Sequence, residues 1–100
     1  MKLKPGAVDE YRRRHDALWP DLAAALKDAG IYDYSIFLDE ETLHLFAVLK
    51  LREGDTSAKV ANLPQLPVMQ RWWESMAELM ETEPGNRPRE WPLTPMFYLE

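Results

Sequence analysis

Residues 31–51, IYDYSIFLDEETLHLFAVLKL, decide the fold, because two alternating runs flank the acidic turn Asp39-Glu40-Glu41. This pattern predicts a β-hairpin with strands over 31–39 and 42–52. In the first run, one face carries Tyr32, Tyr34, Ile36 and Leu38, and the other carries Ile31, Ser35 and Phe37. In the second run, one face carries Leu43, Leu45, Ala47, Leu49 and Leu51, and the other carries His44, Phe46, Val48 and Lys50. Both faces are apolar, so one helical layer leaves the other uncovered, and we expect a partner subunit there.

The segment before the hairpin is predicted to be helical in two pieces. Apolar side chains recur every three or four residues between Tyr11 and Ala29, which is typical of a helix with one buried face. Pro20 disfavours helix at the residue before it, but proline is well tolerated in a first helical turn. We therefore expect helices over 7–17 and 20–29, with a bend near Trp19.

The remaining segments complete an alternation of strands and helices. We expect a short strand over 1–4, a loop with a short helical turn over 53–64, a helix over 65–82, and a last strand over 93–99. The order strand, helix, strand, strand, helix, strand is the ferredoxin-like α+β pattern. Two such sheets pressed together form a dimeric α+β barrel, so residues 1–100 are predicted to be a single domain of a homodimer.

The composition excludes several classes of function. The chain of 100 residues has no cysteine and a net charge of −5, and Arg12, Arg13 and Arg14 form its only basic run. Thiol chemistry is therefore excluded, and we expect no nucleic-acid binding. No apolar run approaches the ~20 residues of a membrane span or the core of a signal peptide, so we expect a cytoplasmic protein with no membrane partner. Nucleotide-binding and serine hydrolase motifs do not occur.

His15 is the strongest candidate for chemistry. It lies on the apolar side of its predicted helix, one turn after Tyr11. Histidine has a reference pKa of about 6.5, so it can donate or accept a proton at neutral pH. On geometry alone, the alternative of a core histidine hydrogen-bonded to Tyr11 is favoured.

Three further aromatic residues and a second histidine complete the candidates. Trp72 and Trp73 point about 100° apart on a helix, so only one of them can enter the core. A buried Tyr34 hydroxyl needs a partner, either a substrate hydroxyl or a backbone carbonyl. His44 lacks companion ligands, and zinc sites need three or four, so no metal site is predicted.

Several motifs resemble those of one known family. Residues 11–22, YRRRHDALWPDL, resemble the Y-x-x-R-H-x-x-x-W-P-x-L signature of the L-rhamnose mutarotase family. The similarity continues through the hairpin, the Q-R-W-W helix at 70–73 and the closing M-F-Y-L at 96–99. It covers nearly the whole chain.

The resemblance implies a dimeric α+β barrel that interconverts the α and β anomers of L-rhamnose without a cofactor. It implies that His15 is the proton donor, and that Tyr11, Tyr34, Trp72 and Trp73 contact the sugar. Unrelated activities share this fold, so two alternatives are a binding protein of the same architecture and a cofactor-free monooxygenase.

Overall fold

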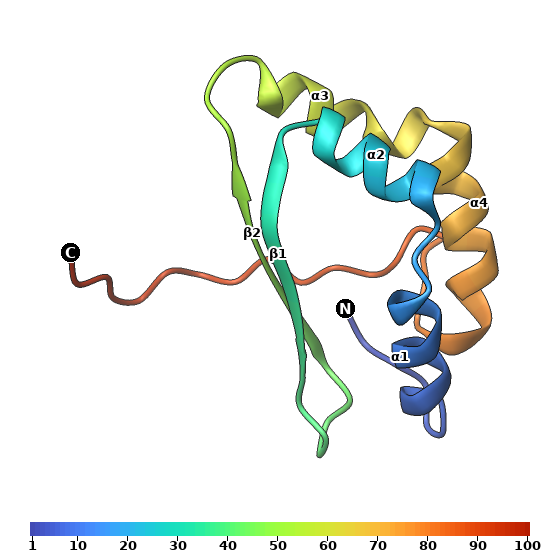
Figure 1. The fold of residues 1–100 in the computed structure, drawn as a ribbon. Coiled ribbons are helices and arrows are strands. Elements are labelled where there is room, and N and C mark those ends of the chain that lie inside the picture. Colours follow the sequence, from blue (N-terminus) through green and yellow to red (C-terminus); the bar gives the residue numbers. More distant parts are fainter.

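The hairpin is the centre of the structure, and all of the helices lie on one side of it (Figure 1). The computed structural model describes residues 1–100, and it confirms the α+β class. Its elements are α1 (Val8–Asp16), α2 (Pro20–Asp28), β1 (Ile31–Leu38), β2 (Leu45–Leu51), α3 (Thr56–Asn62), η1 (Leu63–Gln65), α4 (Pro67–Met76) and η2 (Ala77–Leu79). The sheet contains two strands, β1 and β2, in antiparallel pairing. No helix combines the length and apolar character needed to cross a membrane.

The two-piece helix is confirmed. α1 ends at Asp16, and Trp19 adopts an extended conformation with φ −59° and ψ 129° before Pro20 opens α2. Proline restricts the preceding residue to extended conformations, so the bend falls where the sequence predicts it. The predicted helix over 65–82 is shorter than expected, because α4 ends at Met76 and the 3₁₀ turn η2 ends at Leu79. The predicted loop over 53–64 contains a full helix, α3.

A β-bulge corrects part of the predicted hairpin alternation. Tyr32 pairs with Lys50 and Ser35 pairs with Val48, so Asp33 and Tyr34 together oppose Leu49. Asp33 has φ +47°, in the left-handed region that aspartate tolerates.

The extra residue reverses the facing of everything before it in β1. Ile31, predicted to share a face with Ser35 and Phe37, is instead buried in the core, whereas Phe37 is exposed. Tyr32, predicted to share a face with Tyr34, lies under the Arg52 guanidinium, 4.6 Å from the ring centre.

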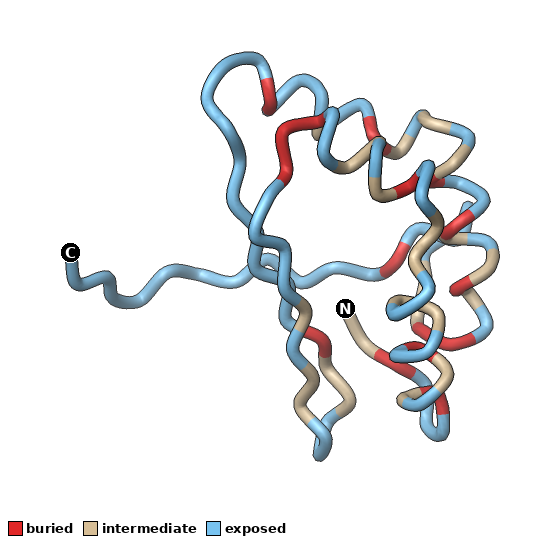
Figure 2. The backbone as a smooth tube through the Cα atoms, viewed as in Figure 1, coloured by how far each residue is buried: buried red, intermediate tan, exposed pale blue.

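The core lies between the helices and the inner side of the hairpin (Figure 2). Its most completely buried side chains are Leu3, Leu22 and Met76, one each from the N-terminal segment, α2 and α4. The predicted strand over 1–4 is reduced to isolated bridges, Lys2 with His44 and Leu3 with Met80. The N-terminal segment still connects the hairpin to the end of the α4 region.

The predicted strand over 93–99 does not form within this chain. Residues 89–100, here called the C-terminal arm, have no regular secondary structure and run past the hairpin into the open (Figure 1). Met96 and Phe97 are 90% and 85% exposed. A strand exists only through hydrogen bonds to a neighbouring strand, and the arm pairs with neither β1 nor β2; its one backbone hydrogen bond runs from Arg89 to the Glu81 carbonyl. A four-stranded ferredoxin-like sheet is therefore not completed by one chain alone.

A substitution at Gly30 tests how closely the junction between α2 and β1 packs against Thr56. The φ of Gly30 is +92°, and an added Cβ would lie 2.2 Å from Cγ2 of Thr56, whose hydroxyl donates to the Arg52 carbonyl. We expect Gly30→Ala to lower the free energy of unfolding by about 2–4 kcal/mol, from backbone strain and the clash together. Gly85, with φ +88° and open space around it, is the matched control, and Gly85→Ala should cost about 1–2 kcal/mol. Equal losses in urea unfolding would contradict the role given to Thr56.

Candidate active site

A cavity of about 470 Å³ lies between the hairpin and the helices. Fifteen residues line it, and twelve of them are hydrophobic. Its volume falls in the range of small-ligand sites, which combine apolar walls with a few polar groups. The lining residues that carry polar atoms on their side chains include Tyr11, Arg12, His15, Asp16 and Tyr34.

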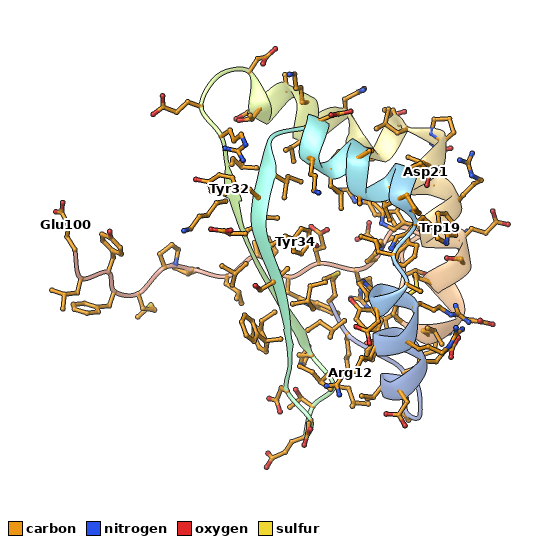
Figure 3. The ribbon with its side chains drawn as sticks, viewed as in Figure 1. Arg12, Trp19, Asp21, Tyr32, Tyr34 and Glu100 are labelled. Atoms are coloured by element: carbon orange, nitrogen blue, oxygen red, sulfur yellow. The ribbon has the colours of Figure 1, made fainter.

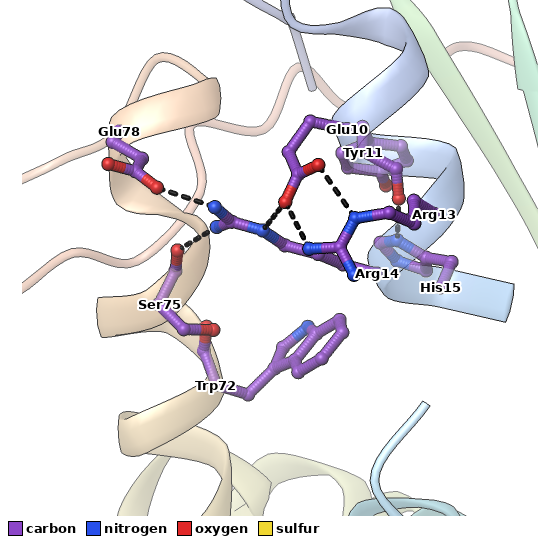
Figure 4. Close-up of polar contacts among 8 residues, drawn as sticks. All are labelled: Glu10, Tyr11, Arg13, Arg14, His15, Trp72, Ser75 and Glu78. Carbon is purple, nitrogen blue, oxygen red and sulfur yellow. Dashed lines mark hydrogen bonds and ion pairs between the residues drawn. The ribbon is translucent and has the colours of Figure 1, made fainter. Parts of the chain in front are cut away.

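The helix α1 holds Tyr11 and His15 against each other. Their rings stack with centroids 4.2 Å apart and planes at 30°. Nδ1 of His15 lies 3.0 Å from the carbonyl oxygen of Tyr11 (Figure 4). A carbonyl only accepts, so Nδ1 carries the hydrogen and donates it. Nε2 is therefore the ring nitrogen left to exchange protons with a ligand.

Trp72 reaches this pair from α4. Its indole meets the His15 ring edge-on, with centroids 5.2 Å apart and an interplanar angle of 83°. The same indole meets Trp19 edge-on at 5.2 Å. Edge-to-face contacts of this kind are the favoured geometry for aromatic pairs. His15 is thus held between a phenol and an indole, and the indole is itself held by the residue before Pro20.

Tyr34 closes the cavity from the hairpin, across from Trp19 and Arg12 on the helical side (Figure 3). The bulge at Asp33 puts Tyr34 on the same face as Ile36 and Leu38, and all three line the cavity. Burial raises the pKa of the Tyr34 hydroxyl, and the Glu90 carboxylate raises it further. Burial also raises the pKa of Tyr11, with a smaller contribution from Tyr34. Both phenols therefore stay protonated near pH 7 and can donate hydrogen bonds.

The pKa of His15 moves in the opposite direction. Burial lowers it from 6.5, because a charged imidazole loses solvation in an apolar cavity. The hydrogen bond to the Tyr11 carbonyl and the Asp16 carboxylate both raise it, but they offset only part of the effect. The neutral form of His15 therefore predominates at pH 7.

The structure brings four of the five predicted site residues to one cavity and leaves one outside. Trp73 is absent from the lining, and its ring lies under the Arg87 guanidinium at 5.8 Å. His44 lies elsewhere, edge-on to Trp91 at 5.7 Å, beside a second cavity between the hairpin and the C-terminal arm. No group of three or more His, Cys, Asp or Glu side chains is gathered as metal ligands.

Sequence reasoning missed Arg12 and Asp16 as cavity residues. Asp16 points about 100° away from His15 on the helix, so spacing alone gave no signal for it. Arg12 is three residues before His15, and there helical spacing contained the signal that the two side chains are neighbours. This signal was missed because charged residues on a surface helix ordinarily belong to its solvent-exposed face.

The fold and the site together define a small α+β protein with a histidine acid–base group in an aromatic cavity. Comparisons with known proteins agree on its relatives. The family model for L-rhamnose mutarotase matches residues 1–99. The L-rhamnose mutarotase of Burkholderia ambifaria is 60% identical over 100 residues, which are 100% of this chain and 93% of that protein. That of Sinorhizobium fredii is 54% identical over 99 residues, covering 99% of this chain and 92% of that protein.

A solved structure is similar as well. The crystal structure of an L-rhamnose mutarotase from Formosa agariphila superposes with a TM-score of 0.87 and 44% sequence identity, covering 100% of this chain and 93% of that one. This chain belongs to the L-rhamnose mutarotase family.

The lowered pKa of His15 has a measurable consequence for stability. In the pH range below 6.5, the unfolded chain binds a proton at this position more readily than the native chain does. The contribution of neutral His15 to stability is therefore complete above pH 6.5 and is lost as the pH falls through 6.5 toward the native value. We expect NMR titration of the imidazole signals to place the His15 midpoint below 6.5. A midpoint at or above 6.5 would contradict the conclusion that burial removes solvation from the His15 ring.

Proposed function

We propose that this protein interconverts the α and β anomers of L-rhamnose, with His15 as the proton donor. The observation that carries the proposal is the free Nε2 of His15 in a cavity shared with Tyr11, Tyr34 and Trp72. Family membership supports the substrate, because relatives that are 52–60% identical are named L-rhamnose mutarotase.

The chemistry requires little more than proton exchange. In ring opening, the bond from the anomeric carbon to the ring oxygen breaks, the ring oxygen gains a proton, and the anomeric hydroxyl loses one to give an aldehyde. The charged fraction of His15, the minority at pH 7, donates its Nε2 proton to the ring oxygen, and water takes the proton of the anomeric hydroxyl. On closure from the other face both transfers run in reverse, so that His15 recovers its proton. Its lowered pKa makes the charged ring a stronger acid. General acid–base help of this kind contributes about 10²–10⁴-fold, or roughly 3–5 kcal/mol.

The walls of the cavity suit a 6-deoxy sugar. Such a sugar has a methyl group and an apolar ring patch, which Trp72 and the neighbouring Leu18 and Leu22 can cover. The Tyr11 and Tyr34 hydroxyls then donate to sugar hydroxyls. We include Trp73 among the sugar contacts on the strength of its family motif, although its ring lies outside the cavity lining of the single chain.

We also propose that two chains associate into a dimeric α+β barrel. The outer face of the hairpin is apolar and open, with Phe37 59% exposed directly opposite Phe46. Patches of this kind mark interaction surfaces, and unpaired sheet edges accept further strands. The end of the C-terminal arm carries exposed apolar side chains, among them Met96 and Phe97, and pairs with no strand of its own chain. Pairing of the arm with the sheet of a second chain would complete the ferredoxin-like strand order.

Mutarotation of freshly dissolved α-L-rhamnose, followed by optical rotation, tests the activity. We expect acceleration over buffer, and a loss of about 10²–10⁴-fold in His15→Asn, whose side-chain amide can still donate to the Tyr11 carbonyl. His44→Gln, which changes the other histidine, should stay within about twofold of the parent. In the same assay, Trp73→Phe tests the proposed sugar contact through KM.

A parent protein that binds L-rhamnose without accelerating its mutarotation would favour the binding-protein alternative. A folded His15→Asn variant with full activity would remove His15 as the acid. An unchanged KM in Trp73→Phe would remove Trp73 from the binding residues.

Light scattering tests the dimer. We expect a mass of twice the 11.7 kDa of one chain. Phe46→Asp places a charge on the outer face of the hairpin and should shift the protein toward the monomer, because burying an unpaired charge is costly. Lys59→Asp, a charge change on the exposed side of α3, is the control and should leave the mass unchanged. A monomeric parent protein at micromolar concentration would overturn the proposal.

A further inference from the structure

The side chain of Arg14 links the helix that carries His15 to the helix that carries Trp72. Its Nε donates to Oε1 of Glu10 at 2.8 Å, one turn back on α1. Its Nη1 donates to the carbonyl of Ser75 in α4, and its Nη2 donates to Oε1 of Glu78 at 2.6 Å (Figure 4). All three guanidinium nitrogens are therefore used.

These contacts lie beside the aromatic contacts of the site. Ser75 is three residues after Trp72, and its hydroxyl donates to the Trp72 carbonyl at 2.7 Å. Arg14 directly precedes His15 on α1. The polar link between the helices and the edge-on contact of His15 with Trp72 thus involve consecutive residues on α1 and residues about one turn apart on α4.

The Arg14 guanidinium is well placed to hold α1 against α4. Carbonyls in the last turn of a helix lack helical partners, and an arginine can satisfy one of them. The Arg14 side chain is 22% exposed and its partner Glu78 is 67% exposed, so the partly buried contact with the Ser75 carbonyl is the better protected part of the link. Among the side-chain hydrogen bonds and ion pairs of the structure, the Arg14 contact with Ser75 is the one that joins α1 to α4, and the Arg14 contact with Glu78 joins α1 to the following turn η2.

Arg13 provides the contrast within the same helix. It also binds Glu10, through Nε at 2.8 Å and through Nη2, but it reaches no other element and its side chain is 67% exposed. Arg13 and Arg14 therefore share a charge and a partner, and they differ in the link to α4.

We propose that Arg14 is a positioning residue for the mutarotase reaction: it holds α1 on α4 so that the His15 ring keeps its place against Trp72. The inference rests on the proposed function for its catalytic readout. A displacement of about 1 Å at a reacting group can cost on the order of 10²-fold in rate. Loss of the link therefore affects the rate more than the affinity for sugar.

The test compares Arg14→Gln with Arg13→Gln, which remove the same charge. We expect Arg14→Gln to lower kcat by about 10- to 100-fold with KM changed by less than about threefold, and Arg13→Gln to stay within about twofold of the parent. Arg14→Lys keeps the charge but not the planar fork, so it should recover little of the lost kcat. Equal effects of the Arg13 and Arg14 variants, or full activity in Arg14→Lys, would overturn the proposal.

An NMR measurement of the His15–Trp72 contact tests the role of Arg14 independently of mutarotase activity. We expect NMR cross-peaks between the His15 and Trp72 ring protons in the parent and in Arg13→Gln, and their weakening in Arg14→Gln. If the parent shows no mutarotase activity, the proposed function fails, while the cross-peaks still decide whether Arg14 holds the two rings together. Should Arg14→Gln not fold, Glu78→Ala, which removes an exposed acceptor, is measured in the same way. Unchanged cross-peaks and kcat in that variant would contradict the link.

Discussion

The contact of Trp72 with both His15 and Trp19 is the interaction on which the rest of the site depends. One indole from α4 meets a ring at the end of α1 and a ring at the start of α2, each at 5.2 Å. Pro20 separates these two helices, and with the bend before it both rings contact the same indole. Removing the indole would leave α1 without its aromatic contact to α4 and would open the cavity on one side.

The same arrangement sets the chemistry of His15. Apolar walls lower the pKa of the imidazole, while the Tyr11 carbonyl holds one ring nitrogen as a donor. Together they leave a single nitrogen for proton exchange, in a cavity that is also lined by two phenols that stay protonated. A polar cavity of the same size would give neither the shifted pKa nor the fixed tautomer, because water would compete for both.

The hairpin shows which structural features could be predicted from the sequence and which could not. Its position was correct, but β2 spans Leu45–Leu51 instead of 42–52, so the turn is longer than predicted. The bulge at Asp33 also reversed the faces of Ile31 and Tyr32. A bulge adds one residue to one strand only, and an alternating pattern read from one strand cannot reveal which partner it opposes. The C-terminal arm shows the same limit. Its composition predicts a strand over 93–99, yet a strand needs a neighbour, and the single chain offers none.

The features of the candidate site, like those of the hairpin, divide into those predicted from the sequence and those decided by the tertiary structure. The sequence by itself determined that Tyr11 and His15 are neighbours one turn apart, that Pro20 breaks the helix after them, and that Trp72 and Trp73 point in different directions, because all three follow from the geometry of a single helix. Only the tertiary structure decided that Trp72 is the one that meets His15, that Tyr34 faces the cavity, and that Arg14 connects α1 to α4. Those contacts join residues far apart in the chain, and their partners are chosen by how the helices pack on the hairpin.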